Sequence, residues 1–107
     1  MVCFGGALGS GARYLVALAT PRSTLLVNLI GSFCIALAIS LMRPSDVRIM
    51  IVSGFLGGFT TYSAFNEETL QMLSSGAFGG AAWNVIVTVA GCLAAGYAGL
   101  TIARMLR

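Results

Sequence analysis

Long apolar runs separated by short polar clusters dominate the chain. Residues 3–20, 24–42, 49–73 and 78–106 are four stretches of mainly apolar and small side chains. Pro21, Pro44 and neighbouring arginines interrupt them. A hydrocarbon core about 30 Å thick is crossed by roughly 17–25 helical residues. The pattern therefore predicts an all-α membrane protein with four transmembrane helices, and the short connections make consecutive helices antiparallel neighbours. No linker is visible, so residues 1–107 are expected to form one domain.

The composition supports lipid as the solvent for most of the surface. Hydrophobic residues make up 58% of the 107 residues and charged residues 8%, whereas about 25% of residues are charged in ordinary soluble domains. We therefore expect a multi-pass protein of the cell membrane. There is no histidine, and the three cysteines are far apart, so neither an enzymatic nucleophile–base pair nor a metal cluster is indicated. The scattered arginines form no basic patch for a nucleic acid.

The arginines predict an orientation in the membrane. With four antiparallel spans, the N-terminus, the second loop and the C-terminus lie on one side. That side carries Arg43, Arg48, Arg104 and Arg107, and the opposite side carries Arg22. Because cytoplasmic loops carry an excess of basic residues, both termini are expected in the cytoplasm.

The third apolar run contains features that are unfavourable in a continuous helix. Its midpoint falls at the pair Gly57 and Gly58, and two threonines follow after one residue. Backbone carbonyls freed inside a membrane need protein, water or an ion as partner, and broken helices often build ion sites in this way. The run therefore favours a helix broken at the double glycine near the bilayer midplane. The alternative is a glycine-rich packing face whose hydroxyls bond back to the helix.

Several polar and aromatic side chains within the spans have two interpretations. Asn28 can form an interhelical hydrogen bond or present an amide N–H to an anion. Arg13 can extend to the membrane interface or line a wet vestibule, and Glu68 can be an interfacial charge. Tyr62 and Phe65 share a helix face, where they can pack or turn electropositive ring edges toward an anion.

Small residues recur at intervals of four. Gly5 and Gly9 have this spacing in the first run, and Gly54 and Gly58 have it in the third. Such spacing lets helix backbones approach closely in lipid. We expect these glycines to mark helix–helix contacts.

Three segments resemble the Fluc/CrcB family of fluoride channels, in the right order and along nearly the whole chain. They are GGALGSGARY at residues 5–14, TLLVNLIGSF at residues 24–33 and GGFTTYSAF at residues 57–65. The resemblance implies a channel subunit that exports fluoride passively, in an antiparallel dual-topology dimer with two pores. It also implies a structural Na⁺ between the two broken third helices, bound by the carbonyls of Gly57 and Thr60.

The resemblance also assigns side chains to the pore. The implied fluoride path contains Thr24, Asn28, Tyr62, Ser63, Phe65 and Thr88, and the implied vestibule contains Arg13 and Glu68. Hydroxyl and amide donors with aromatic edges can replace the water of fluoride. A fixed positive charge in the narrow part would bind the ion too tightly to release it.

The sequence departs from the family pattern at Tyr62, where phenylalanine is usual, and at Cys92, where serine is expected. These departures leave open a homodimer, a heterodimer with a paralogous subunit, and a non-conducting partner subunit. A small multidrug-type transporter is the remaining alternative. That chemistry needs a carboxylate embedded in the membrane, and the first run contains no acidic residue.

Overall fold

The computed structural model describes residues 2–106, and these residues form helices and turns without a strand. The predicted all-α class is thus confirmed. Arg107, which contributed to the predicted orientation, lies outside the described residues. Three helices are long and apolar enough to cross a membrane: α1 (Val2–Ala19), α2 (Ser23–Leu41) and α6 (Phe78–Leu106). Their bounds agree closely with the first, second and fourth apolar runs.

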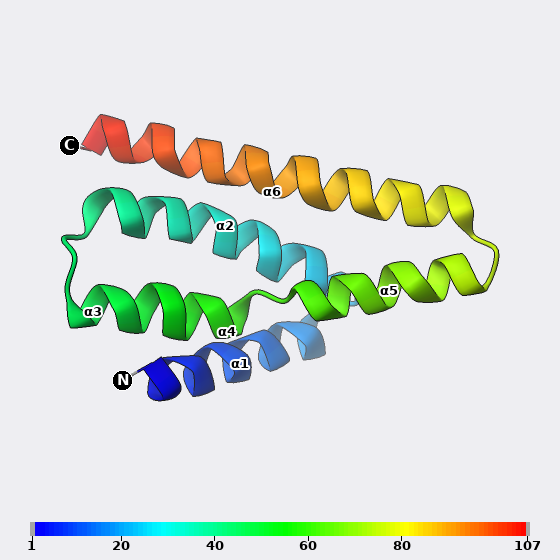
Figure 1. Ribbon diagram of the computed structural model, residues 1–107, viewed down its shortest axis with the longest axis horizontal. Coiled ribbons are helices and arrows are strands. Elements are labelled where there is room, and N and C mark those ends of the chain that lie inside the picture. The colour runs from blue at the N-terminus through cyan, green and yellow to red at the C-terminus, as the bar shows by residue number, and fades with distance from the viewer. Residues whose placement is uncertain (1, 107) are drawn as a thin grey trace.

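The third apolar run consists of several shorter helical pieces. It begins with α3 (Asp46–Ile49), where Ser45 Oγ accepts a hydrogen bond from the backbone N–H of Arg48. The chain continues through the π-helix η1 (Met50–Leu56) into α4 (Gly57–Phe59) and, after an interruption, into α5 (Tyr62–Ser74). In Figure 1 these pieces lie roughly end to end beside the longer helices. The third run is therefore helical but not one continuous helix.

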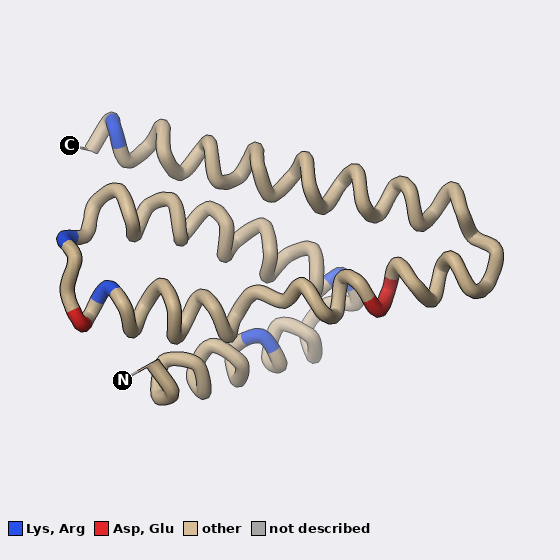
Figure 2. Tube along the Cα trace, viewed as in Figure 1, with Lys and Arg blue, Asp and Glu red and all other residues tan. Residues whose placement is uncertain are grey.

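The helices pack in two groups that share the third run. Helix α2 lies along α6, whereas α1 lies against η1 and α4 (Figure 1). The chain termini and the α2–α3 connection lie at one end of the molecule, as expected for antiparallel neighbours. Basic positions occur at this end, in the α2–α3 connection and near the end of α6 (Figure 2). The predicted cytoplasmic location of this end stays a prediction.

Glycines allow α1 to approach the third run at backbone distance. A Cβ atom on Gly5 would lie 2.6 Å from the carbonyl oxygen of Met50, and one on Gly9 would overlap the carbonyl of Phe55. A Cβ atom on Gly54 would lie 2.9 Å from the carbonyl oxygen of Val2. Because these positions have no room for a side chain, the predicted small-residue contact is confirmed. It fixes α1 against the segment that precedes the interruption.

Candidate functional site

The third run is interrupted at Thr60 and Thr61, not at the double glycine. Thr60 has φ −81° and ψ 156°, and Thr61 has φ −149° and ψ 113°, both extended. Gly57 remains helical with φ −62° and ψ −37°. The predicted position of the break is therefore wrong by a few residues. Gly58 serves packing instead, since a Cβ atom on it would lie 2.6 Å from the carbonyl oxygen of Gly6 in α1.

The side-chain amide of Asn28 in α2 forms two hydrogen bonds with the backbone of the interrupted segment. Its Oδ1 accepts a hydrogen bond from the backbone N–H of Thr61 at 2.8 Å, and its Nδ2 donates to the Thr61 carbonyl at 3.0 Å. Thr61 Oγ1 accepts a hydrogen bond from the backbone N–H of Ala64 at 3.2 Å and so caps the start of α5. Capping of this kind satisfies N–H groups that have no partner inside the helix. The amide pair and the cap together replace the helical bonds that the extended residues give up.

The interruption removes the helical donors of several backbone carbonyls, among them those of Gly57 and Thr60. The N–H groups four residues beyond Gly57 and Thr60 belong to Thr61 and Ala64. These N–H groups donate to Asn28 Oδ1 and to Thr61 Oγ1 instead. Gly57 is also exposed on the surface of the chain. The two carbonyls that the resemblance assigns to Na⁺ are thus among those that the interruption deprives of N–H partners.

A cavity of about 290 Å³ lies beside the interruption. It brings together four side chains of the predicted fluoride path, Asn28, Tyr62, Phe65 and Thr88, with further residues of α2 and α6. Its lining consists of Asn28, Ser32, Ile35, Thr60, Tyr62, Phe65, Thr88, Val89 and Cys92. No charged side chain is among them. The cavity is therefore lined by neutral polar groups, aromatic rings and apolar side chains.

Several hydrogen-bond donors of the cavity are free. The amide nitrogen of Asn28 carries two N–H groups, and one of them donates to Thr61. Thr88 is only 8% exposed, yet among the described residues its hydroxyl forms no hydrogen bond. By contrast, the hydroxyls of Thr60 and Thr69 donate to carbonyls one turn earlier, as is common for threonine in helices. Since no fully buried side-chain oxygen of residues 2–106 lacks a partner, the Thr88 hydroxyl keeps access to the cavity and can donate to a polar group there.

Two aromatic rings lie next to one another at the start of α5. The centroids of Tyr62 and Phe65 are 5.7 Å apart, with an interplanar angle of 62°, so one ring presents its edge to the other. Phe65 is buried at 7% exposure, whereas Tyr62 is 74% exposed. Phe65 therefore belongs to the inner wall of the cavity, and Tyr62 stands at its outer rim.

Thr24, Glu68 and Arg13 lie outside this cavity. Thr24 Oγ1 donates a hydrogen bond of 2.7 Å to Glu68 Oε1, which joins α2 to α5. Both residues line a second cavity of about 650 Å³, and Thr24 and Arg13 line a third cavity of about 250 Å³. Thr61 also lines the third cavity. Arg13 and Glu68 are thus separated from the neutral cavity.

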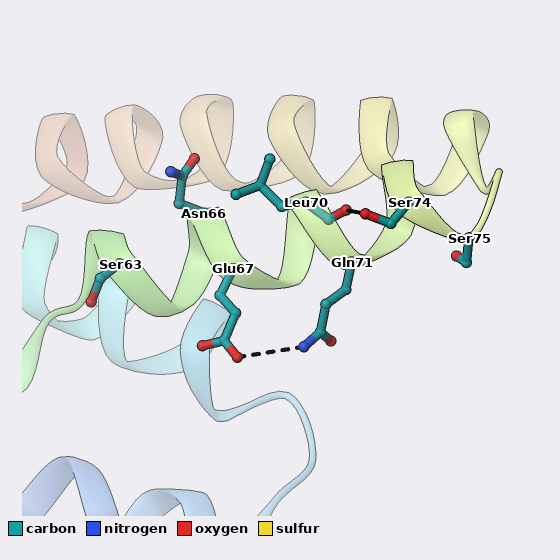
Figure 3. Close-up of a pocket in the computed structure, with 7 residues that line it drawn as sticks. All are labelled: Ser63, Asn66, Glu67, Leu70, Gln71, Ser74 and Ser75. Carbon is teal, nitrogen blue, oxygen red and sulfur yellow. Dashed lines mark hydrogen bonds between the residues drawn. The ribbon is translucent and has the colours of Figure 1, made fainter.

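Ser63, the remaining residue of the predicted path, lies on a different face. It borders a shallow groove of about 570 Å³ on the outer side of α5, together with Asn66, Glu67 and Gln71. Figure 3 shows these side chains along one helix, with the Gln71 amide nitrogen 3.4 Å from a Glu67 carboxylate oxygen. The Ser63 hydroxyl is 3.3 Å from Thr61 Oγ1. The structure thus brings four of the six predicted path residues into one cavity and places Thr24 and Ser63 elsewhere.

Sequence reasoning did not single out Ser32 or Thr61 for the site. Ser32 follows Asn28 by four residues, so the helical repeat places both on one face of α2. Thr61 precedes the apolar face of α5 in the position of an N-cap, for which threonine is a favoured residue. Both signals were available in the sequence. The pairing of Thr61 with Asn28, 33 residues away, was not.

Comparisons with known proteins give matches along nearly the whole chain. The family model described as CrcB-like protein, Camphor Resistance (CrcB), matches residues 1–100. A protein of Anaeromyxobacter dehalogenans named fluoride-specific ion channel FluC is 46% identical, and the match covers 99% of this chain and 94% of that protein. A protein of the same name from Geobacter sulfurreducens is 41% identical, and the match covers 94% of this chain and 92% of that protein. Another from Bordetella petrii is also 41% identical, and the match covers 99% of this chain and 91% of that protein.

Proposed function

We propose that this chain, which belongs to the CrcB-like protein family, is a subunit of a channel that lets fluoride leave the cell passively. The chain is a multi-pass protein of the cell membrane, with three long apolar helices and relatives named as fluoride-specific ion channels. A channel, and not an enzyme, is the class to which those names belong. The neutral cavity at the interrupted helix is the observation that carries the proposal.

The cavity chemistry suits a small and strongly hydrated anion. The free N–H of Asn28 and the hydroxyls of Ser32 and Thr88 are donors that can replace water around fluoride. The edge of an aromatic ring is electropositive, and Phe65 and Tyr62 supply such edges. Because no basic side chain of the described residues lines the cavity, an ion entering it meets donors that bind without trapping it. Arg13 is set apart and raises the local anion concentration from a distance.

We propose that two copies, or this chain and a paralogous subunit, assemble in opposite orientations. Tyr62 is 74% exposed at the rim of the cavity, so a neighbouring chain can complete the wall that a single subunit leaves open. The polar groove on α5, which contains Asn66, Glu67 and Gln71, is unfavourable against lipid. A partner subunit or a water-filled entrance on that face would remove this cost. The four-span topology with both termini in the cytoplasm is part of the same proposal.

Na⁺ fits the carbonyls at the interruption. Gly57 and Thr60 present oxygens whose helical donors have been withdrawn, and such carbonyls coordinate monovalent cations in broken membrane helices. One subunit supplies two of these oxygens, so a complete coordination shell requires the equivalent pair from a partner. The bound ion would hold the two interrupted helices together and contribute a fixed positive field to the dimer.

Fluoride efflux from proteoliposomes tests the proposed path through Thr88. Replacement of Thr88 by valine keeps the shape and removes the donor. Because a hydrogen bond to a charged group is worth about 1.5–3 kcal/mol and about 1.4 kcal/mol corresponds to a factor of ten, we expect fluoride efflux to fall about tenfold. Thr101→Val is the matched control, since the Thr101 hydroxyl donates to the Tyr97 carbonyl on the exposed side of the same helix. Equal efflux from the two variants would place the fluoride path elsewhere.

A further inference from the structure

Cys92 places a free thiol in the neutral cavity. It lies on α6 four residues after Thr88, on the same helix face, and both residues line the cavity. Cys92 is half-buried and forms no disulfide. The other two cysteines, Cys3 and Cys34, are absent from the lining of this cavity. Among the described residues, the site therefore contains a single sulfur.

The unpartnered Thr88 hydroxyl is a second and independent sign that the cavity accommodates a ligand beside this sulfur. Every side-chain nitrogen or oxygen of the described residues that is fully inaccessible has a hydrogen-bond partner. Thr88 Oγ1 has none, although Thr88 is 92% buried (8% exposed). Its hydroxyl must therefore keep accessible surface, and the cavity that Thr88 lines provides it. An open oxygen donor and a thiol thus border the same space, one helical turn apart.

The thiol of this pair selects soft cations. Thiolate sulfur favours soft metal ions over hard ones, and a single thiol satisfies an organomercurial, which has one open coordination position. The cavity volume of about 290 Å³ greatly exceeds the roughly 30 Å³ that one water molecule occupies in the liquid. A methylmercury cation can therefore reach the sulfur without displacing the surrounding helices.

We propose that Cys92 is a binding site for thiophilic metal cations and that occupation of this site closes the fluoride path. The blocking effect rests on the proposed function, whereas metal binding at Cys92 does not. When methylmercury acetate reacts, a mercury–sulfur bond forms, the bond from mercury to acetate breaks, and the thiol proton passes to the buffer. No oxidation state changes. The methyl group then occupies the space next to Thr88 and Asn28, where the donors for fluoride lie.

Two variants distinguish the reaction of methylmercury at Cys92 from its reaction at the other two cysteines. The double variant Cys3→Ser/Cys34→Ser keeps only the cavity thiol, and Cys92→Ser keeps only the two others. Each is reconstituted into liposomes, and fluoride efflux is recorded with a fluoride electrode before and after methylmercury acetate. Each treated sample is compared with its own untreated efflux, because Cys92 lines the path and its replacement can alter the starting rate. Mass spectrometry of the same samples counts the methylmercury groups bound.

The double variant is expected to bind one methylmercury group and to lose efflux at least about tenfold, because conduction requires a vacant path. Excess dithiothreitol should remove the metal and restore the flow. Cys92→Ser is expected to keep its untreated rate after methylmercury. Inhibition that persists in Cys92→Ser, or a double variant that binds the metal without losing efflux, would overturn the proposed block.

The mass spectrum distinguishes failure of this inference from failure of the proposed function. If the untreated double variant shows no fluoride efflux, the proposed function fails for the reconstituted chain. A methylmercury adduct on Cys92 in that sample would still support the metal site. The absence of an adduct on Cys92 in the folded double variant would overturn the site itself, whatever the efflux.

Discussion

Replacement of Asn28 by leucine removes both hydrogen bonds that hold the interrupted segment of the third run. Leucine and asparagine have similar size, so the change removes the amide while keeping most of the volume. In the native chain the amide oxygen accepts from the Thr61 N–H at 2.8 Å, and the amide nitrogen donates to the Thr61 carbonyl at 3.0 Å. Because Thr61 is only 7% exposed, water has little access to the two groups that the variant leaves without partners.

The burial of Thr61 decides the size of the effect. Interhelical hydrogen bonds in membrane proteins average about 0.6 kcal/mol each, which gives about 1.2 kcal/mol for two. A buried polar group left unsatisfied costs about 1–3 kcal/mol, which gives about 2–6 kcal/mol for two. Since the Thr61 groups are backbone atoms fixed in an extended segment, the second estimate applies, reduced by some water from the adjoining cavity. We expect Asn28→Leu to lower the free energy of unfolding by about 2–4 kcal/mol.

Unfolding in mixed detergent micelles, followed by circular dichroism as the denaturing detergent is increased, measures this difference. Asn84→Leu is the matched control, because Asn84 forms one interhelical hydrogen bond, of 2.9 Å, to Thr69 Oγ1. Thr69 keeps its other bond to the Phe65 carbonyl, so the control should lose only about 0.6 kcal/mol. If Asn28→Leu were no more destabilising than Asn84→Leu, the amide of Asn28 would not be what stabilises the interruption.

Two further predictions concern the packing around the site. Gly9→Ala should destabilise the fold by more than about 2 kcal/mol, because its Cβ atom would overlap the Phe55 carbonyl. Gly11→Ala, whose Cβ atom would have nothing within 4 Å, should be neutral or slightly stabilising in the same unfolding assay. Equal effects of the two substitutions would contradict the close approach of the backbones. Thr24→Val should lower the free energy of unfolding by about 1.5–3 kcal/mol, because it removes a 2.7 Å hydrogen bond to the Glu68 carboxylate. Thr24→Ser keeps the hydroxyl and should keep native stability. A serine variant as unstable as the valine variant would show that the hydroxyl is not what matters.

The pattern of apolar runs was sufficient to predict α1, α2 and α6, because each is a continuous apolar stretch bounded by proline, arginine or a turn. The connection from α5 to α6 is such a turn, and it contains Gly76 at φ 83°, a conformation that favours glycine. The small-residue spacing also identified the correct partners, α1 and the segment before the interruption. These features depend on local sequence and on the thickness of the membrane.

The position of the break could not be predicted in the same way. Helix propensity pointed to Gly57 and Gly58, the weakest helix formers in the run. Gly58 packs closely against α1, both glycines stay helical, and the bonds from Asn28 place the extended residues at Thr60 and Thr61. Both influences are tertiary, so propensity was overridden by contacts between segments far apart in the sequence.

Only part of the candidate site was predicted from the sequence. Asn28, Tyr62, Phe65 and Thr88 come from three helices and meet in one cavity, as the resemblance to fluoride channels implies. Ser63 immediately follows Tyr62 in α5, and its side chain therefore points to another side of the helix, toward the outer groove. A linear motif gives the residues of a site, but the helical repeat decides which of them face the same space.

The ratio of fluoride to chloride efflux tests the central claim most directly. The chain is reconstituted in liposomes, alone and together with a paralogous subunit from the same source, and both anions are measured under the same potential. A neutral cavity of small donors and aromatic edges predicts rapid fluoride efflux and chloride efflux no faster than from liposomes without protein. Equal rates for the two anions, or no fluoride efflux with either composition, would contradict the account.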